Sequence, residues 1–385
     1  MKLAYITLRF PFPLTSGRLR QYHLIRQLKS RACVKLICVS PESADEETQA
    51  ALNAIAGEVL YVCSRGLESD IKNTRESAKL RLRDELDSAC REHAAEVVCS
   101  MSGLPLACMP VDTGPLLVDF CDAEWFKALE KARLERFPDS LRWRVRAYRT
   151  RRYERRLARL ADHAFFAAPR DAERVLGGIP TPYNVLPNGV DAEFWRRSQS
   201  LPDPDVILFA GAFSYQPNVD AAIYLAREIF PLVQKSAPRA QLVLAGRDPP
   251  PELKAFHNAP TITVTGFVPD IRPYHERATV FVAPLRVAGG IQNKLLEAMA
   301  METPVVASTK GVAGLGLSNN EIASCQLEVR DDTEGLAAAV VDILRRKRET
   351  PGLAPENRAM VTRRYSWEHA SAIVINAIEK LIAQS

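Results

Sequence analysis

The stretch that most constrains the fold covers residues 280–308, where a strand pattern, a glycine loop, a helix pattern and a second strand pattern follow one another. Residues 280–283 form an apolar run closed by Pro284, and residues 305–307 form the second apolar run. Short apolar runs bounded by proline predict buried strands. Residues 291–301 between them have a helix-forming composition. The stretch therefore predicts a strand–helix–strand unit of an α/β fold.

The loop before the predicted helix contains Gly289 and Gly290. Glycine lets the backbone approach a ligand, and the free amides at a helix start carry partial positive charge, so a phosphate or diphosphate fits there. Lys294 can add a point charge, and Glu297 can accept hydrogen bonds from two neighbouring hydroxyls such as those of a ribose. The alternative is a tight turn that leads into an ordinary packed helix.

The same alternation of strand and helix patterns continues on both sides of this stretch. Strand patterns are predicted at residues 3–7, 34–39, 59–62, 95–99, 115–120 and 164–168, and again at 206–210, 241–245 and 261–265. Helix patterns are predicted near residues 21–30, 76–93, 123–131, 221–234, 336–346 and 368–382, with Pro231 expected to kink or interrupt the fourth. Strands separated by helices predict parallel sheets, which bind ligands at the carboxyl ends of their strands.

The composition is that of a globular protein long enough for two domains. The chain has 385 residues, of which 47% are hydrophobic and 25% charged, with a net charge of +5. It contains no apolar run long enough for a transmembrane helix and no apolar signal-peptide core at its start. The eight cysteines include no CxxC pair and no metal-type spacing. We therefore expect reduced thiols in a cytoplasmic protein.

Carboxylates gather at the end of the strand predicted over residues 115–120. Asp119 and Asp122 are candidates to position an acceptor hydroxyl or to take its proton, because a carboxylate in a partly closed site has a raised pKa. The alternative is that Asp122 caps the helix that follows. Asp203 and Asp205 match a metal-binding DxD pattern, but they stand in a proline-rich linker, and we expect no metal.

Residues 127–159 are strongly basic, with 13 lysine or arginine residues against four acids, and Trp143, Tyr148 and Tyr153 are mixed among them. One interpretation is a solvated helical face. Another is a basic amphipathic helix that contacts anionic lipid headgroups, which would place the protein at the inner face of a membrane. The third is nucleic-acid binding, but the rest of the chain has no nucleic-acid motif, so we expect no such partner.

The sequence of residues 291–308, IQNKLLEAMAMETPVVAS, resembles the donor-nucleotide motif of the retaining glycosyltransferases of family four. It is most similar to the exopolysaccharide and exosortase-associated sugar transferases, whose motif runs close to GIQNKVLEAMAMGKPVVAS. Residues 185–191, VLPNGVD, resemble the hinge segment between the two domains of that family.

The resemblance implies the GT-B fold, in which two Rossmann-like domains face a central cleft and the C-terminal helix crosses back to the first domain. It predicts an acceptor domain made of residues 1–184 with 366–385, and a nucleotide-sugar donor domain made of residues 185–365.

The resemblance also assigns roles to individual residues. In the family, two glutamates separated by seven residues hold the donor; the second, which grips the ribose, falls on Glu297, and the first, which contacts the sugar, falls on Gly289. The family's Arg and Lys after Gly211 are missing, so Arg247, Arg286 and Lys294 are left to offset the diphosphate charge. The full set of expected donor-binding residues is Gly17, Gly211, Arg247, Val268, Arg286, Gly289, Gly290, Ile291, Gln292, Asn293, Lys294 and Glu297.

The implied reaction is transfer of a sugar from a UDP- or GDP-linked donor to a hydroxyl of a glycan, a lipid-linked saccharide or a small molecule, with retention of configuration. We expect a metal-independent hexosyltransferase without a further cofactor, acting in polysaccharide or glycoconjugate synthesis. Asp119, Asp122 and Lys294 are the catalytic candidates. Two alternatives stay open, a nucleotide-sugar epimerase and a GT-B protein that binds nucleotide or glycan without catalysis.

Overall fold

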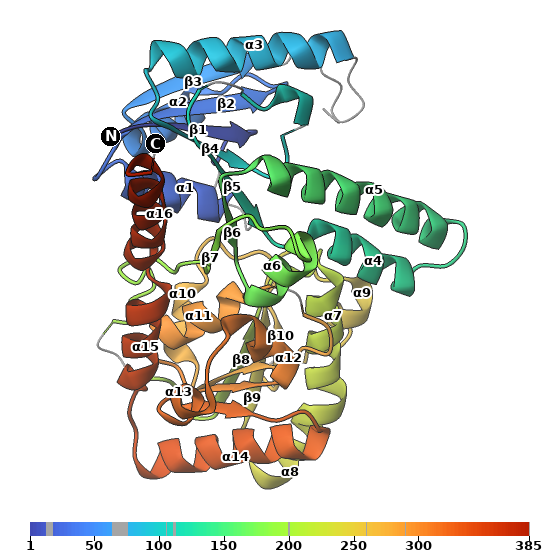
Figure 1. Ribbon diagram of the computed structural model, residues 1–385. Helices are drawn as coiled ribbons and strands as arrows, with labels where there is room; N and C mark the ends of the chain where they lie inside the picture. The colour runs from blue at the N-terminus through green and yellow to red at the C-terminus, as the bar shows by residue number, and fades with distance from the viewer. Residues whose placement is uncertain are drawn as a thin grey trace. The chain divides into compact units, whose positions relative to one another are not determined.

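The computed structural model describes residues 1–12, 18–63, 76–104, 106–110, 113–198, 201–258, 260–288 and 290–384. The chain divides into two compact units (Figure 1). Unit 1 combines Met1–Asn188 with Trp367–Ser385, and unit 2 is Gly189–Ser366. The assignment of an acceptor to the first domain and a donor to the second stays a prediction.

Unit 1 is built on a parallel sheet with the strand order β3-β2-β1-β4-β5-β6-β7. Its strands are β1 (Lys2–Leu8), β2 (Cys33–Ser40), β3 (Glu58–Cys63), β4 (Val97–Met101), β5 (Leu116–Cys121), β6 (His163–Phe166) and β7 (Tyr183–Val185). The strand order reverses between β1 and β4, because the chain moves outward from β1 to β3 and then returns to the other side of β1. Ligands of such sheets bind beside this reversal, at the carboxyl ends of the strands.

Helices cover both faces of this sheet. On one face lie α1 (Leu19–Leu28), α2 (Glu46–Ile55) and α16 (Trp367–Ile382), and on the other lie α3 (Glu76–Glu92), α5 (Asp139–Leu160) and α6 (Pro169–Leu176). The short helix η2 (Leu106–Cys108) and α4 (Glu124–Leu134) complete the unit. Side chains of β1 alternate between the two cores, since Leu3 and Tyr5 pack with the first set of helices and Ala4 and Ile6 with the second.

The C-terminal helix α16 packs on unit 1, which confirms the predicted return of the chain to the first half of the protein. The Trp367 ring stacks on His23 of α1, with ring centroids 5.0 Å apart and planes at 6°. Val374 and Ile378 of α16 share a buried cluster with Leu24 of α1. The last helix therefore closes one face of the first sheet.

Unit 2 is built on a second parallel sheet, with the strand order β10-β9-β8-β11-β12-β13. The strands are β8 (Val206–Ala210), β9 (Gln241–Ala245), β10 (Ile262–Val264), β11 (Val280–Ala283), β12 (Val305–Ala307) and β13 (Leu327–Val329). The helices are α7 (Gln216–Tyr224), α8 (Phe230–Ser236), α9 (Pro251–Lys254), α10 (Arg272–Arg277), α11 (Asn293–Ala300), α12 (Thr309–Val312), η4 (Ala313–Leu315), α13 (Asn319–Ala323), α14 (Thr333–Glu349) and α15 (Pro355–Tyr365). The predicted α/β class with two parallel sheets is confirmed.

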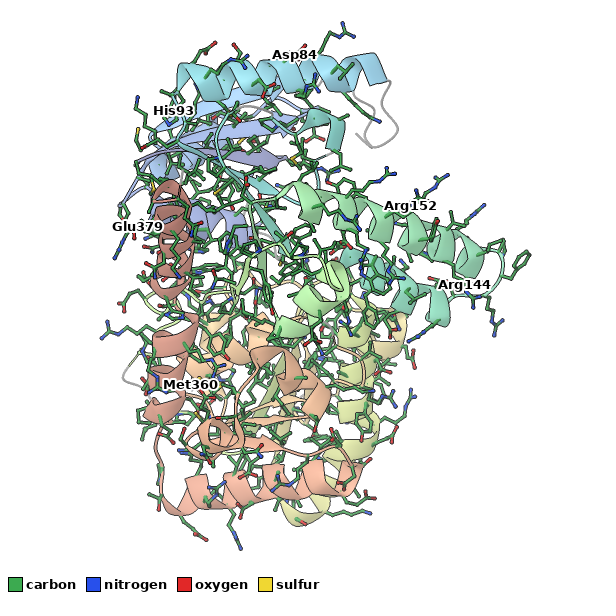
Figure 2. The ribbon with its side chains drawn as sticks, viewed as in Figure 1. Asp84, His93, Arg144, Arg152, Met360 and Glu379 are labelled. Atoms are coloured by element: carbon green, nitrogen blue, oxygen red, sulfur yellow. The ribbon has the colours of Figure 1, made fainter. Side chains whose placement is uncertain are left out.

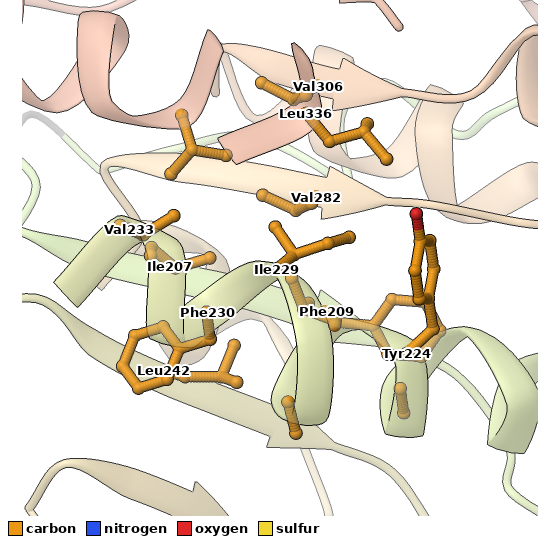
Figure 3. Close-up of a cluster of buried hydrophobic side chains, with 14 of the residues drawn as sticks. Ile207, Phe209, Tyr224, Ile229, Phe230, Val233, Leu242, Val282, Val306 and Leu336 are labelled. Atoms are coloured by element: carbon orange, nitrogen blue, oxygen red, sulfur yellow. The ribbon is translucent and has the colours of Figure 1, made fainter. Parts of the chain in front are cut away.

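Unit 2 also has one core on each face of its sheet. The core in Figure 3 is formed by α7, α8 and α14 against the strands, with Phe209, Val282 and Val306 facing Ile229 and Leu336. The opposite core is formed by α11 and α15. Because strands buried on both faces are apolar throughout, the strand runs of unit 2 are continuous rather than alternating.

The helix predicted over residues 221–234 is interrupted, as expected from Pro231. It begins at Gln216 and changes to a π-helical turn over Leu225–Ile229 before α8. Proline has no N–H group to donate, and its ring collides with the carbonyl one turn earlier in a regular α-helix. The wider π turn just before Pro231 accommodates the ring.

Candidate functional site

The predicted phosphate loop leads from β11 into α11. Gly290 has φ of 60°, in the left-handed region where glycine is favoured. A Cβ at residue 314 would lie 1.8 Å from the carbonyl oxygen of Gly290, so Gly314 allows the two segments to touch. The N-cap of α11 is Gln292, whose side chain makes no capping hydrogen bond. The Gln292 side chain therefore does not compete with an anion at this helix start. The predicted Gly289 lies outside the described residues.

Lys294 is half-buried in the first turn of α11 and reaches the end of β8. Its Nζ donates to Oδ1 of Asn218 and lies 4.9 Å from the centroid of the Phe209 ring. The Nδ2 group of Asn218 donates to the carbonyl oxygen of Ala212 at 2.8 Å, which orients the amide. Burial lowers the pKa of Lys294 to about 8, although the charge of Glu297 opposes this shift. Lys294 is thus a poorly solvated cation that an anionic ligand would stabilise.

Glu297 lies one turn further along α11 and is also half-buried. Burial raises the pKa of Glu297 to about 7, and the positive charge of Lys294 opposes this shift. Within the described part of the chain, no group donates a hydrogen bond to the Glu297 carboxylate. Because buried polar groups are nearly always hydrogen-bonded, a carboxylate held without donors is suited to accept hydroxyls from a ligand.

Two arginines stand at the same edge of the sheet. Arg286 follows β11, and its Nε donates to Oδ2 of Asp220 at 3.0 Å while its guanidinium lies 4.8 Å from the centroid of the Tyr224 ring. The hydrogen bond with Asp220 raises the pKa of Arg286. Arg247 follows β9, is as exposed to solvent as Arg286, and has its Nε 3.8 Å from Oδ2 of Asp248. A diphosphate would compete with Asp220 for Arg286 but would meet a weaker competitor at Arg247.

The carboxyl ends of the parallel strands bring the predicted donor residues to one edge of unit 2. Gly211 follows β8, and a Cβ there would lie 3.1 Å from Nζ of Lys294. A Cβ at Gly246, after β9, would lie 1.9 Å from the carbonyl oxygen of Gly211, so these two loops also touch. Ile291 is buried in the core on the α11 side of the sheet, and Val268 is half-buried in the loop after β10.

In unit 1, Asp119 is engaged in a buried ion pair with Arg20 of α1. Its Oδ2 accepts from Nε of Arg20 at 2.7 Å and its Oδ1 accepts from Nη2 at 3.0 Å. Arg20 also donates from Nη1 to the carbonyl oxygen of Leu186 at 2.8 Å and to Oδ1 of Asn188 at 3.0 Å. The predicted role of Asp119 as a proton acceptor would require this bidentate pair to open.

Asp122 is the more open of the two predicted carboxylates, with 19% of its side chain exposed. Its Oδ2 accepts from Nζ of Lys127 at 2.7 Å, and Lys127 also donates to Oε1 of Glu124 at 2.8 Å. The alternative role as a helix cap is wrong, because the N-cap of α4 is Ala123. The buried Glu154 carboxylate of α5 takes the capping position and accepts from the N–H of Glu124 at 2.9 Å.

Three side chains at these edges were not among the predicted site residues. Arg20 and Asn218 hold two of the predicted residues in place. The third, Asp171 in α6, is buried, and its pKa is raised by burial and by the charge of Asp122. The sequence could have indicated Asp171, because it is an acid that closely follows the strand predicted over residues 164–168. The predicted Gly17 lies outside the described residues.

Comparison with known proteins places this geometry in context. Residues 204–346, most of unit 2, match the family described as "Glycosyl transferases group 1". No curated protein matches the chain. A solved structure of sucrose-phosphate synthase from Thermosynechococcus elongatus is similar over 100% of both chains, with a TM-score of 0.67 at 14% identity. The structure of Anabaena HepE in complex with UDP covers 99% of this chain and 100% of its own, with a TM-score of 0.68 at 13% identity.

The chain has the GT-B fold. A putative UDP-N-acetylglucosamine 2-epimerase from Listeria monocytogenes shares it less closely, with a TM-score of 0.53 at 13% identity over 100% of this chain and 98% of its own. The family match in unit 2 and the fold of the whole chain together support a group 1 glycosyltransferase.

Proposed function

We propose that the protein is a retaining glycosyltransferase of family four that uses a UDP- or GDP-linked sugar. The observation that carries this proposal is the arrangement on α11, where Lys294 and a Glu297 carboxylate without donors follow a helix start without a side-chain cap. Amides and ammonium suit a diphosphate, and the carboxylate suits the hydroxyls of a ribose. HepE, which has a similar fold, has been solved with UDP, with UDP and glucose, and with UDP-glucose, which supports a donor of this class.

In this reaction the bond between the anomeric carbon and the diphosphate oxygen breaks, and negative charge grows on the departing diphosphate. The α11 amides and Lys294 are held in position before the reaction, so they stabilise that charge without reorganising. With a pKa of about 8, Lys294 is mainly protonated at neutral pH, and a bound diphosphate strengthens its hold on the proton. Arg247 and Arg286 add positive charge at the same edge.

We assign the acceptor to the carboxyl edge of the sheet in unit 1. Asp122 is our candidate to orient the acceptor hydroxyl or take its proton, because it is the more exposed of the two predicted carboxylates and Asp119 is held by Arg20. The resemblance of residues 291–308 to exopolysaccharide-associated transferases favours a glycan or lipid-linked acceptor in polysaccharide or glycoconjugate synthesis.

We also propose that transfer needs no metal ion. The diphosphate charge is met by helix amides and by the cations Lys294, Arg247 and Arg286. Across the described ranges, no three His, Cys, Asp or Glu side chains gather as a metal-ligand set. Treatment with EDTA should leave the transfer rate unchanged. A loss of rate that Mg²⁺ restores would contradict this part of the proposal.

The test is a panel of nucleotides and nucleotide sugars, with binding measured by calorimetry and turnover measured by release of nucleotide. Glu297→Ala should weaken donor binding by about 2–4 kcal/mol, because a half-buried charged acceptor is lost. Glu349→Ala, which removes an exposed acid at the end of α14, is the matched control and should bind like the wild type. Normal donor use by the Glu297 variant would remove α11 from the site.

The same panel separates the alternatives. A transferase releases nucleotide when an acceptor is present, whereas an epimerase changes the sugar without an acceptor. A protein that only binds is stabilised by nucleotide and consumes none. The epimerase alternative is kept because the Listeria structure shares the fold.

A further inference from the structure

We propose that the α4–α5 hairpin, residues 124–160, docks on the surface of an anionic membrane. The two helices lie side by side and leave the rest of unit 1 as one projection (Figure 1). This inference concerns a surface of unit 1, whereas the proposed donor residues belong to unit 2, and it does not depend on the proposed function.

The hairpin is a rigid part of unit 1. Small buried side chains, Ala128 and Ala132 of α4 and Ala147 of α5, allow the two helices to approach closely. At its base, Leu157 is buried in the core of the unit, and Oη of Tyr153 donates to the carbonyl oxygen of Ser102 at 2.6 Å. The surface that the hairpin presents is therefore fixed by packing at one end.

Large apolar side chains are exposed at the far end of the hairpin. Leu141, Val145 and Tyr148 are spaced four and three residues apart on α5, so they share one face, and they are 53%, 46% and 61% exposed. Phe137, in the turn between the helices, is 80% exposed. Single exposed apolar residues are ordinary, but four of them at one end of a projection mark a surface for contact.

Arginine side chains surround this apolar end. Residues 127–159 have 13 lysine or arginine residues against four acids, an excess larger than the net charge of +5 for the whole chain, so the remainder is net acidic. Of the four acids, Glu154 is buried as the cap of α4. Figure 2 shows Arg144 and Arg152 extending outward from α5. In the part of the chain that the structure describes, no ion pair involves the exposed Arg136, Arg144, Arg149 or Arg156.

The combination of these two features fits a bilayer surface. Guanidinium groups bind phosphate headgroups, while aliphatic and aromatic side chains on the same face enter the boundary between headgroups and acyl chains. A nucleic acid would use the arginines, but Leu141, Val145 and Phe137 would gain little on its charged backbone. Among the described residues, no helix combines the length and apolar character needed to cross a bilayer. The contact we infer is therefore peripheral.

The first experiment measures co-sedimentation of the full chain with two kinds of vesicle, one of phosphatidylcholine alone and one of equal parts phosphatidylcholine and phosphatidylglycerol. We expect binding to the anionic vesicles only, and weaker binding at high salt. The variant Arg144→Gln/Arg149→Gln/Arg156→Gln should partition roughly 100-fold less, at about fivefold for each arginine. The control variant Arg196→Gln/Arg239→Gln/Arg345→Gln loses the same charge from exposed sites of unit 2 and should bind normally.

The second experiment tests the apolar end. Phe137→Ser/Leu141→Ser removes two exposed side chains, so it should leave the melting temperature unchanged and still lower binding to anionic vesicles about tenfold or more. Equal binding of the wild type to both kinds of vesicle would overturn the proposal, as would unchanged binding of the arginine variant. Tight binding of a DNA duplex that weakens with salt and is lost in the arginine variant, without vesicle binding, would assign the hairpin to nucleic acid instead and would also overturn the proposal.

Discussion

The substitution Glu297→Gln should make the ligand-free protein more stable and at the same time weaken its binding of nucleotide. Glu297 is half-buried without a hydrogen-bond donor among the described residues, so the folded protein holds an ionised carboxylate that is poorly compensated. Glutamine keeps the size and one acceptor oxygen but removes the charge. The variant gains stability but loses affinity because the same buried negative charge destabilises the ligand-free protein and is proposed to bind the ribose.

The size of the stability gain follows from the pKa of Glu297, which burial raises from 4.5 to about 7. A shift of this size corresponds to roughly 3 kcal/mol of free energy against the ionised form in the folded state. The attraction between Glu297 and Lys294 is lost in the variant, which reduces the gain. We therefore expect a net stabilisation of about 1–2 kcal/mol at pH 8, and a rise in melting temperature of about 2–8 °C.

The stability that Glu297→Gln gains over the wild type should increase as the pH rises. Below pH 4.5 the carboxyl of Glu297 is mostly protonated in both the folded and the unfolded chain, so its burial does not lower the stability of the wild type. Between pH 4.5 and about 7 the unfolded chain releases this proton while the folded chain retains it, and the wild type loses stability as the pH rises. Above about pH 7 the loss is constant. The difference in melting temperature between variant and wild type should therefore appear over this interval.

The assay is a set of thermal melts of both proteins from pH 4.5 to pH 8, with UDP and GDP titrations at pH 8. Glu349→Gln on α14 is the control for removing an exposed acid and should show neither effect. A variant that is less stable than the wild type at pH 8 would refute the reasoning about burial. Unchanged affinity for every nucleotide would refute the ribose contact.

Three further predictions concern the backbone and the buried ion pair. Gly314→Ala should displace the loop at Gly290, because the new Cβ would lie 1.8 Å from the Gly290 carbonyl oxygen. Nucleotide binding measured by calorimetry should weaken tenfold or more. In the control Gly352→Ala the new Cβ meets nothing within 4 Å, so this variant should bind normally. Glu302 follows the end of α11 with its backbone in the left-handed region, which glycine adopts more easily. Glu302→Gly should therefore raise the free energy of unfolding by about 0.5–1 kcal/mol in urea melts, and Glu302→Asn should raise it less. A lower free energy of unfolding for the glycine variant would contradict the argument. Arg20→Met should destabilise the protein by about 3–5 kcal/mol by leaving the Asp119 carboxylate buried and unpaired, and the double variant Arg20→Met/Asp119→Leu should recover much of that loss in the same melts. If the double variant is no more stable than Arg20→Met, the unpaired Asp119 carboxylate is not the cause of the destabilisation.

Much of the fold was predictable because its strands are short apolar runs closed by glycine or proline. In unit 2, β8, β9, β11 and β12 have the bounds predicted from the sequence. Pro231 marked the interruption of its helix correctly. These features depend on residues close together in the chain, which a sequence pattern records.

Elements that depend on distant contacts were missed. Helix α15 has little segregation of apolar and polar residues, and its position is fixed by Arg358, which donates to the carbonyl oxygens of Ala192, Trp195 and Ala300. Strand β13 has only three residues and was not predicted. In both cases tertiary packing, rather than local pattern, determines the structure.

The candidate site divides in the same way. Gly290, Lys294 and Glu297 belong to one loop and one helix, so their positions relative to one another could be predicted from spacing alone. The partners that set their environment could not, because Asn218 is 76 residues from Lys294 and Arg20 is 99 residues from Asp119. Sequence reasoning therefore identified the candidate groups but not the pair that holds Asp119.

The return of α16 to unit 1 gives the protein an order of assembly during synthesis. Unit 2 is continuous in sequence and can form its own two cores as soon as it leaves the ribosome. Unit 1 is completed later, since the apolar surface of α1 and of the sheet that α16 covers stays open to water until α16 has emerged. The half of the molecule that is translated first is thus the half that is completed last, and a shortened chain would carry an exposed apolar face rather than merely lack a helix.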